Sequence, residues 1–157
     1  MEKQNFYDLN FDHLKNFLTS KVEIDSTKAK MRAQQMFNAV YKKNIKSFDE
    51  LTTFSLELRE KIKKLISLEK PKIVDIQKSK DGTIKFLLEL KDKRNVETVL
   101  IPDKSQSRYT ICLSVSVGCY LSCEFCATAQ ISKNLVRNLT PGEIISQIIL
   151  SKDYIDD

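Results

Sequence analysis

Three cysteines, at positions 119, 123 and 126, stand in a C-x3-C-x2-C spacing that constrains this chain more than any other feature of its sequence. This spacing lets the thiolates of Cys119, Cys123 and Cys126 converge on one metal centre. A 4Fe-4S cluster is normally held by cysteine thiolates, so three closely spaced ligands would leave one iron open to a substrate or cofactor. A structural zinc site is usually closed by four protein ligands, in C-x2-4-C pairs that a longer loop separates. The spacing therefore favours an iron-sulfur cluster over zinc.

Cys112 is the fourth cysteine of the chain and keeps other interpretations open. A zinc site that uses all four cysteines is one alternative, and unliganded core cysteines are another. Residues 109–117 alternate between apolar and polar side chains, which predicts a strand. On that strand Cys112 would lie on the polar face, about 15 Å or more before the cysteine loop at roughly 3.3 Å per residue. The chain would have to fold back for Cys112 to join the other three.

Residues 1–70 show helical periodicity and predict a small helical domain. Residues 11–18 form a short amphipathic stretch, and Ser26 is a candidate cap for a second helix. The apolar stripe of that second helix consists of Ala29, Ala33, Met36, Phe37, Val40 and Tyr41. A third helix places Leu58, Ile62, Leu65 and Ile66 on one side and ends before Pro71. We expect these stripes to form a core.

After Pro71 the pattern changes to strands, at residues 73–77, 83–90 and 96–101. The pair Asp81-Gly82 between the first two is a hairpin signal. Residues 102–107 form a polar connector, so we expect a β-hairpin and strand segment over 71–107 and a further domain over 108–157. In that last segment a strand is followed by the cysteine loop and by a helix that opens with a capping box, Thr140 to Glu143, with Pro141 at its first position.

Charge and hydropathy narrow the function further. The chain has 26 Lys and Arg against 21 Asp and Glu, and residues 26–48 contain six basic residues and no acid. Such a segment could contact phosphates, although a solvated helix face is the simpler interpretation. No apolar run approaches the roughly 18 to 20 residues of a membrane span, and the N-terminus does not resemble a signal peptide. We expect a cytoplasmic protein with reduced cysteines and no membrane partner.

From residue 81 onward, the sequence resembles RlmN-type radical S-adenosylmethionine (SAM) enzymes, which methylate C2 of adenine in RNA. The matching segments are DGTIK (81–85), VETVLIP (96–102), CLS (112–114), VGC (117–119), CEFC (123–126), TAQ (128–130), RNL (137–139) and GEII (142–145). This similarity covers much of the chain after residue 80.

The resemblance implies a role for each candidate site residue. Cys119, Cys123 and Cys126 would bind the 4Fe-4S cluster, whose open iron chelates SAM. Phe125 would lie near the adenine of SAM or cover the cluster. Glu97 would accept a proton, and Cys112 would assist release of the RNA adduct together with a second, methyl-bearing cysteine that has no counterpart in this sequence. Without the resemblance, Glu97 would be interpreted as a solvent-facing strand residue.

The resemblance also implies the fold and the partners. We expect an α+β arrangement, a small helical domain and a β-hairpin region, followed by the first βα unit of an incomplete radical SAM (β/α) barrel. A complete barrel takes about 250 residues, so we expect a truncated front part that is inactive alone and completed by a separate chain. The substrates would be 23S ribosomal RNA and a further candidate, tRNA, with no DNA. An inactive remnant that retains RNA binding and a zinc-binding structural protein are the alternatives.

Overall fold

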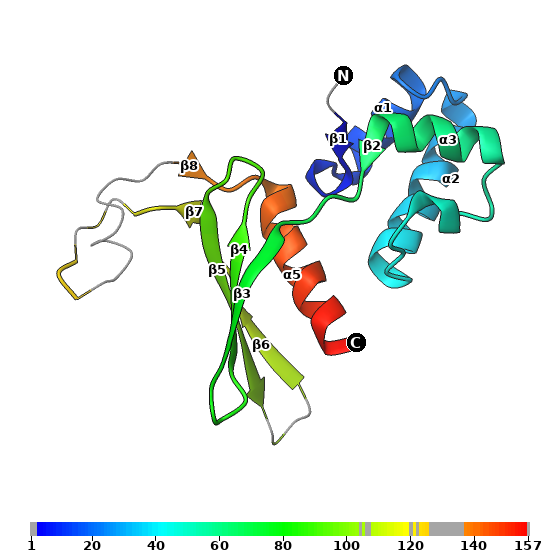
Figure 1. The fold of residues 1–157 in the computed structure, drawn as a ribbon. Coiled ribbons are helices and arrows are strands. Elements are labelled where there is room, and N and C mark those ends of the chain that lie inside the picture. The colour runs from blue at the N-terminus through cyan, green and yellow to red at the C-terminus, as the bar shows by residue number, and fades with distance from the viewer. Residues whose placement is uncertain are drawn as a thin grey trace. The chain divides into compact units, whose positions relative to one another are not determined.

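A computed structural model of the protein describes residues 3–103, 105, 108–119, 121, 123–125 and 137–156. The chain divides into two compact units, Met1–Glu69 and Lys70–Asp157 (Figure 1). Among the described residues, no helix combines the length and the apolar character that crossing a membrane would require.

The first unit is helical, as its periodicity predicts. Its elements are β1 (Gln4–Asn5), η1 (Phe6–Asp8), α1 (Phe11–Ser20), α2 (Ser26–Phe37), η2 (Asn38–Lys42), η3 (Phe48–Glu50), α3 (Leu56–Leu65) and β2 (Ile66–Ser67). The element η2 is a π-helical turn that continues α2, and β1 pairs in parallel with β2. The three predicted helices are therefore confirmed, except that Ile66 belongs to a strand.

The start of α2 differs from the prediction in one residue. Asp25, and not Ser26, is the cap: its Oδ1 accepts a hydrogen bond from the Thr27 N–H at 2.8 Å, and Ser26 is the first helical residue. The same carboxylate accepts a hydrogen bond from the Thr27 hydroxyl. A carboxylate is a stronger acceptor than a hydroxyl and is also favoured by the positive end of the helix dipole. These two advantages explain why the acidic residue takes the cap position.

The core of the first unit contains the predicted stripe of α2. Ala29, Ala33 and Met36 are fully buried, and Phe6 packs against the rings of Phe37 and Tyr41 with centroid distances of 5.5 and 5.8 Å. Phe37 and Tyr41 themselves are half-buried at the edge of this cluster. Aromatic packing of this kind supplies much of the apolar contact in a unit of this size.

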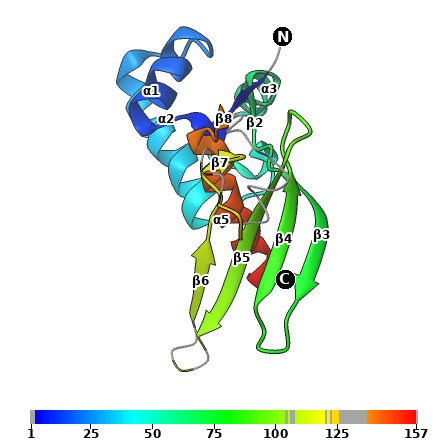
Figure 2. The ribbon, with the colours of Figure 1, turned by 90° about the vertical axis from the view of Figure 1, so that its left-hand side faces the viewer.

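The second unit is built on a four-stranded antiparallel sheet in the order β3-β4-β5-β6 (Figure 2). Its strands are β3 (Lys72–Lys78), β4 (Ile84–Glu89), β5 (Asn95–Asp103) and β6 (Arg108–Cys112). The predicted hairpin at Asp81-Gly82 is confirmed, with Gly82 at a φ of 95° that favours glycine. The expected connector at 102–107 begins too early, because β5 continues through Pro102 and Asp103, which pair with Tyr109 and Arg108 of β6.

A smaller pair of strands and a helix complete the second unit. The pair consists of β7 (Ser116–Val117) and β8 (Arg137–Asn138), which are antiparallel, and helix α5 (Pro141–Asp156) follows. The predicted capping box is confirmed: Thr140 Oγ1 accepts from the Glu143 N–H at 3.1 Å, and Glu143 Oε2 accepts from the Thr140 N–H at 2.8 Å.

Residues 109–117 are predicted as one strand, and this prediction is wrong. Strand β6 ends at Cys112 and β7 begins at Ser116. The interruption arises because the backbone of Ser114 hydrogen-bonds to the side chain of Gln147 on α5 instead of to a neighbouring strand. A buried glutamine thus replaces a strand neighbour at this point.

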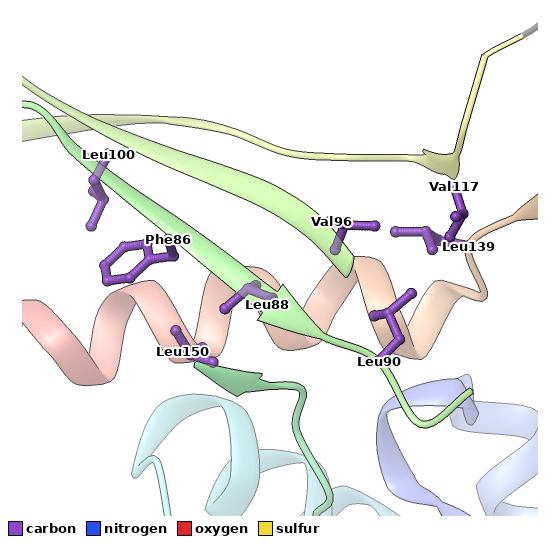
Figure 3. Packing of buried hydrophobic residues seen from close by; sticks show 8 residues of the cluster. All are labelled: Phe86, Leu88, Leu90, Val96, Leu100, Val117, Leu139 and Leu150. Carbon is purple, nitrogen blue, oxygen red and sulfur yellow. The ribbon is translucent and has the colours of Figure 1, made fainter. Parts of the chain in front are cut away.

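Helix α5 covers one face of the sheet, and the core lies between them (Figure 3). On β4 and β5 every second side chain points into this core, as the two-residue period of a strand requires. The buried cluster consists of Phe86, Leu88, Leu90, Val96, Leu100, Val117, Leu139 and Leu150. Tyr154 of α5 contacts Phe86 edge to face with ring centroids 5.0 Å apart. Val117 of β7 and Leu139, which follows β8, belong to this cluster, so the small β7-β8 pair packs on the same core.

Candidate functional site

The cysteine loop supplies thiols at the surface of the second unit. Cys119 and Cys123 are half-buried and Cys112 is exposed, and all three are free thiols. Cys126, the third predicted ligand, lies outside the described residues. Within the described ranges, no three Cys, His, Asp or Glu side chains are grouped closely enough to hold a metal ion. Two of the three predicted ligands, Cys119 and Cys123, are free thiols of one loop, and cysteine thiolates are the ligands that iron-sulfur clusters normally take.

The two ends of the cysteine loop are held side by side. Ser116 pairs with Asn138 and Val117 with Arg137, and the Leu139 N–H donates to the Val115 carbonyl at 2.9 Å. The chain therefore leaves the small sheet and returns to it at directly opposite positions. Gly118 has a φ of 78°, a conformation that favours glycine, immediately before Cys119. The glycine lets the chain turn out of β7 into the loop.

Arg137 anchors the returning end of the loop. Its guanidinium binds Glu143 in a bidentate pair with two N···O distances of 2.7 Å, and its Nε lies 2.9 Å from Asp92 Oδ2. These charge-assisted hydrogen bonds are the strong kind. The hydrogen bonds to Arg137 lower the pKa of both Glu143 and Asp92, and they raise the pKa of Arg137. Because Glu143 also caps α5, one carboxylate joins the loop end to the helix.

Glu97 and Cys112, the two predicted catalytic residues, lie on the same face of the sheet. Cys112 is opposite Val99 in the β5-β6 register, and Glu97 precedes Val99 by two residues. Opposite residues share a face and so do residues two apart, so the two side chains are diagonal neighbours, typically about 7 Å apart. This outer face is the one that α5 leaves uncovered.

The surroundings of Glu97 are polar. Its carboxylate lies 3.0 Å from Lys85 Nζ, and its side chain is 53% exposed. The second unit by itself therefore leaves the Glu97 carboxylate in contact with solvent and with a basic neighbour. In the described structure Glu97 is a solvent-facing strand residue.

Phe125 is 92% exposed in the described structure. Both interpretations of Phe125, contact with the adenine of SAM and cover of the cluster, place the ring against a bound group, and both stay predictions. An exposed ring beside the last cysteine is compatible with contact to a bound ligand.

The basic segment 26–48 divides into two kinds of residue. Arg32 has a structural role, because its guanidinium donates to the Thr53 carbonyl at 3.0 Å and stacks 4.7 Å from the centre of the Phe54 ring. The five lysines are exposed, at positions 28, 30, 42, 43 and 46. These lysines, and not Arg32, are the side chains that can reach an external phosphate.

Sequence reasoning missed the residues that hold the loop. Arg137 stands in a matched motif, but its partners Asp92 and Glu143 are 45 and 6 residues away, and no spacing rule connects them. Gln147 is also polar yet fully buried. A glutamine among the isoleucines of the last helix was the available signal.

Comparison with known proteins places this geometry in a class. The chain is similar in fold to a radical SAM methyltransferase from Sphaerobacter thermophilus, with a TM-score of 0.82 at 30% identity over 98% of this chain and 42% of that protein. The fold of this chain is thus shared with part of a radical SAM methyltransferase.

Sequence comparison gives a narrower similarity. Residues 4–68 match the family described as "Ribosomal RNA large subunit methyltransferase N-terminal domain". The chain is 41% identical to the dual-specificity RNA methyltransferase RlmN of Campylobacter fetus subsp. fetus and 40% identical to that of Oleidesulfovibrio alaskensis, in each case over 95% of this chain. The resemblance to the N-terminal portion of RlmN-type methyltransferases is therefore confirmed. The chain spans about two-fifths of the length of these relatives, 42% and 40%.

The Arg137–Glu143 pair predicts an acid-dependent loss of stability. Because the folded-state pKa of Glu143 lies below its ordinary value, the pair stabilises the fold fully above that ordinary value and loses this contribution as the pH falls through the lowered pKa. Replacing Glu143→Gln should destabilise the second unit by about 1–3 kcal/mol at pH 7, with a smaller penalty in acid. Thermal unfolding of both proteins between pH 7 and pH 3 measures this.

Glu57→Gln is the matched control, because Glu57 is an exposed glutamate in the first turn of α3. It should leave both the stability and its pH profile nearly unchanged. An equal stability gap between wild type and Glu143→Gln at every pH would contradict the account.

Proposed function

We propose that this chain is the cluster-binding front part of a radical SAM enzyme that methylates C2 of adenine in RNA. Its substrates would be 23S ribosomal RNA and tRNA. The observation that carries the proposal is the loop of Cys119 and Cys123, whose ends are pinned by the β7-β8 pair and by Arg137. The similarity to RlmN-type relatives over nearly the whole chain supports it.

The three cysteines Cys119, Cys123 and Cys126 would hold the cofactor, a 4Fe-4S cluster. When bound, this cluster would supply an electron to SAM coordinated at its open iron. The contribution of the chain itself is to present three thiolates from one short loop and to keep the ends of that loop together. Three protein ligands would leave one iron of the cluster without a protein ligand and open to SAM.

The outer face of the sheet would supply the remaining catalytic groups. Glu97 would act as a proton acceptor and Cys112 as the thiol that assists release of the RNA adduct. Their shared face and diagonal placement support a common role. A proton acceptor of this kind needs a buried carboxylate, so we propose that protein outside residues 1–157 covers this face in the active enzyme. The site of action would be the cytoplasm.

Metal content tests the proposal directly. After anaerobic reconstitution with ferrous iron and sulfide, the chain should bind about four irons and show the visible absorbance of a cluster. The triple variant Cys119→Ser/Cys123→Ser/Cys126→Ser should lose this iron, because it lacks the thiolate ligands. Cys112→Ser is the control and should retain it.

Binding of one zinc per chain without iron would instead favour the structural zinc protein. Loss of iron in Cys112→Ser would show that the fourth cysteine is a ligand and would contradict the assignment of the three.

RNA binding by the helical unit gives a second test. If the exposed lysines of residues 26–48 neutralise phosphates, affinity for a ribosomal RNA fragment should fall steeply with salt. The variant Lys42→Gln/Lys43→Gln should reduce the slope of log affinity against log salt by about 2, roughly 1 for each lysine. Filter binding over a salt series measures the slope.

The control is Lys64→Gln/Lys80→Gln, which removes two exposed lysines outside this segment. It should leave the slope unchanged. Equal reductions in both variants would indicate non-specific attraction to net charge. Salt-dependent RNA binding in a chain that binds no iron would favour the inactive remnant.

A further inference from the structure

Gln147 is a fully buried polar residue in the middle of α5, and all of its hydrogen-bonding groups are used. Its Oε1 accepts from the Thr98 hydroxyl at 2.7 Å and from the Ser114 N–H at 3.0 Å. Its Nε2 donates to the Ser114 carbonyl at 2.9 Å and to the Glu143 carbonyl at 3.2 Å. A buried amide without these partners would be costly, so the side chain is fixed in one orientation. A flipped amide would place its NH2 group against the Ser114 N–H and its oxygen against the carbonyl oxygens of Ser114 and Glu143.

This carboxamide acts on Ser114 as a neighbouring strand would. It pairs with both the N–H and the carbonyl of Ser114, at the point where the β6 strand has ended. The Ser114 hydroxyl in addition donates to the Glu97 carbonyl at 2.7 Å. The Ser114 N–H and carbonyl are thereby hydrogen-bonded to α5, and the Ser114 hydroxyl is hydrogen-bonded to β5.

The position of Ser114 gives these bonds a consequence for the site. Ser114 lies between Cys112, which ends β6, and Cys119, which follows β7. The β5-β6 register already sets where Cys112 lies against Glu97. Fixing the Ser114 backbone sets where the chain, after Cys112, turns towards the cysteine loop. Glu143, one helical turn before Gln147, holds the other end of the loop through Arg137. One face of α5 thus holds the chain both before and after the loop.

We propose that Gln147 is a positioning residue that fixes the segment between Cys112 and Cys119, and thereby the first ligand of the cysteine loop. The significance of this role for cluster binding rests on the proposed function. Gln147 touches neither the cysteines nor any reacting group in the described structure, so it acts through Ser114. Thr98 supports it by anchoring Oε1 from β5.

Amide hydrogen exchange of the 157-residue chain, read by NMR, tests the hold on Ser114. In wild type the Ser114 amide should exchange slowly although it lies outside any strand. In Gln147→Met, which keeps the volume and removes the hydrogen bonds, it should exchange about tenfold faster or more. The amides of β4 and β5 should keep their wild-type rates. Thr98→Val, which removes one donor and preserves shape, should give a smaller acceleration at Ser114.

A spectroscopic comparison separates positioning from general support of the fold. After anaerobic reconstitution and reduction, the electron paramagnetic resonance spectrum of Gln147→Met should differ from wild type in its g values or line width, because the ligand loop is less well fixed. Gln77→Met is the matched control, since Gln77 is an exposed glutamine on β3. It should change neither the exchange rates nor the spectrum.

Three results would overturn the inference. They are an unchanged Ser114 exchange rate in Gln147→Met, an acceleration spread equally over β4 and β5, and an unchanged spectrum in an iron-loaded variant. A wild-type chain that binds no iron, but in which Gln147→Met frees Ser114 selectively, would reject the proposed function and retain the positioning role of Gln147 in the loop segment.

Discussion

Helix α5 lies across one face of the four-stranded sheet, and this contact determines where the cysteine loop starts and ends. Its apolar part consists of Leu150 and Tyr154 against Phe86 and the other buried residues of β4 and β5. Burial of side chains of this size contributes about 1.5–3 kcal/mol each, which supplies the free energy of the contact. The polar groups Gln147 and Glu143 then use the same helix to fix the chain on either side of the loop.

The two faces of the sheet have different roles. One packs against α5 and stabilises the fold, and the other carries the proposed catalytic groups. The inner face is apolar and packs on α5, apart from the hydrogen bond between Thr98 and Gln147. The outer face presents Glu97, Lys85 and Cys112 to solvent. Glu97 and Thr98 are consecutive residues of β5, so their side chains point to opposite faces, Glu97 to solvent and Thr98 into the core. Glu97, which we propose as a proton acceptor, is thus the direct neighbour of Thr98, whose hydroxyl donates to the Gln147 side chain that holds Ser114.

Local patterns in the sequence predicted most of the elements. The Asp81-Gly82 hairpin and the capping box from Thr140 to Glu143 are set by residues close together in the chain, and both are confirmed. The strand break at residues 113–115 could not be predicted, because it depends on a side chain 33 residues further on. The alternation of apolar and polar residues there concerns the side chains alone. It carries no information about which group hydrogen-bonds to the Ser114 backbone. The cap at Asp25 was missed for a different reason, since two adjacent residues were both acceptable caps.

In the candidate site, too, features set by nearby residues were predicted and features that depend on distant residues were not. The cysteine spacing predicted a metal-binding loop from sequence alone, and the family resemblance supplied Glu97 and Cys112, which the register then brings to one face. The Arg137 and Gln147 contacts are long-range polar interactions that only the folded chain reveals.

The most direct test of the account is methylation by a hybrid enzyme in which this chain replaces the corresponding part of an RlmN-type relative. Mass spectrometry of 23S ribosomal RNA from cells that lack their own enzyme would measure 2-methyladenine. The account predicts that the hybrid forms 2-methyladenine and that it loses this activity when Cys119 is replaced by serine. Unmodified adenine from a hybrid that folds and binds as much iron as the intact relative would contradict it.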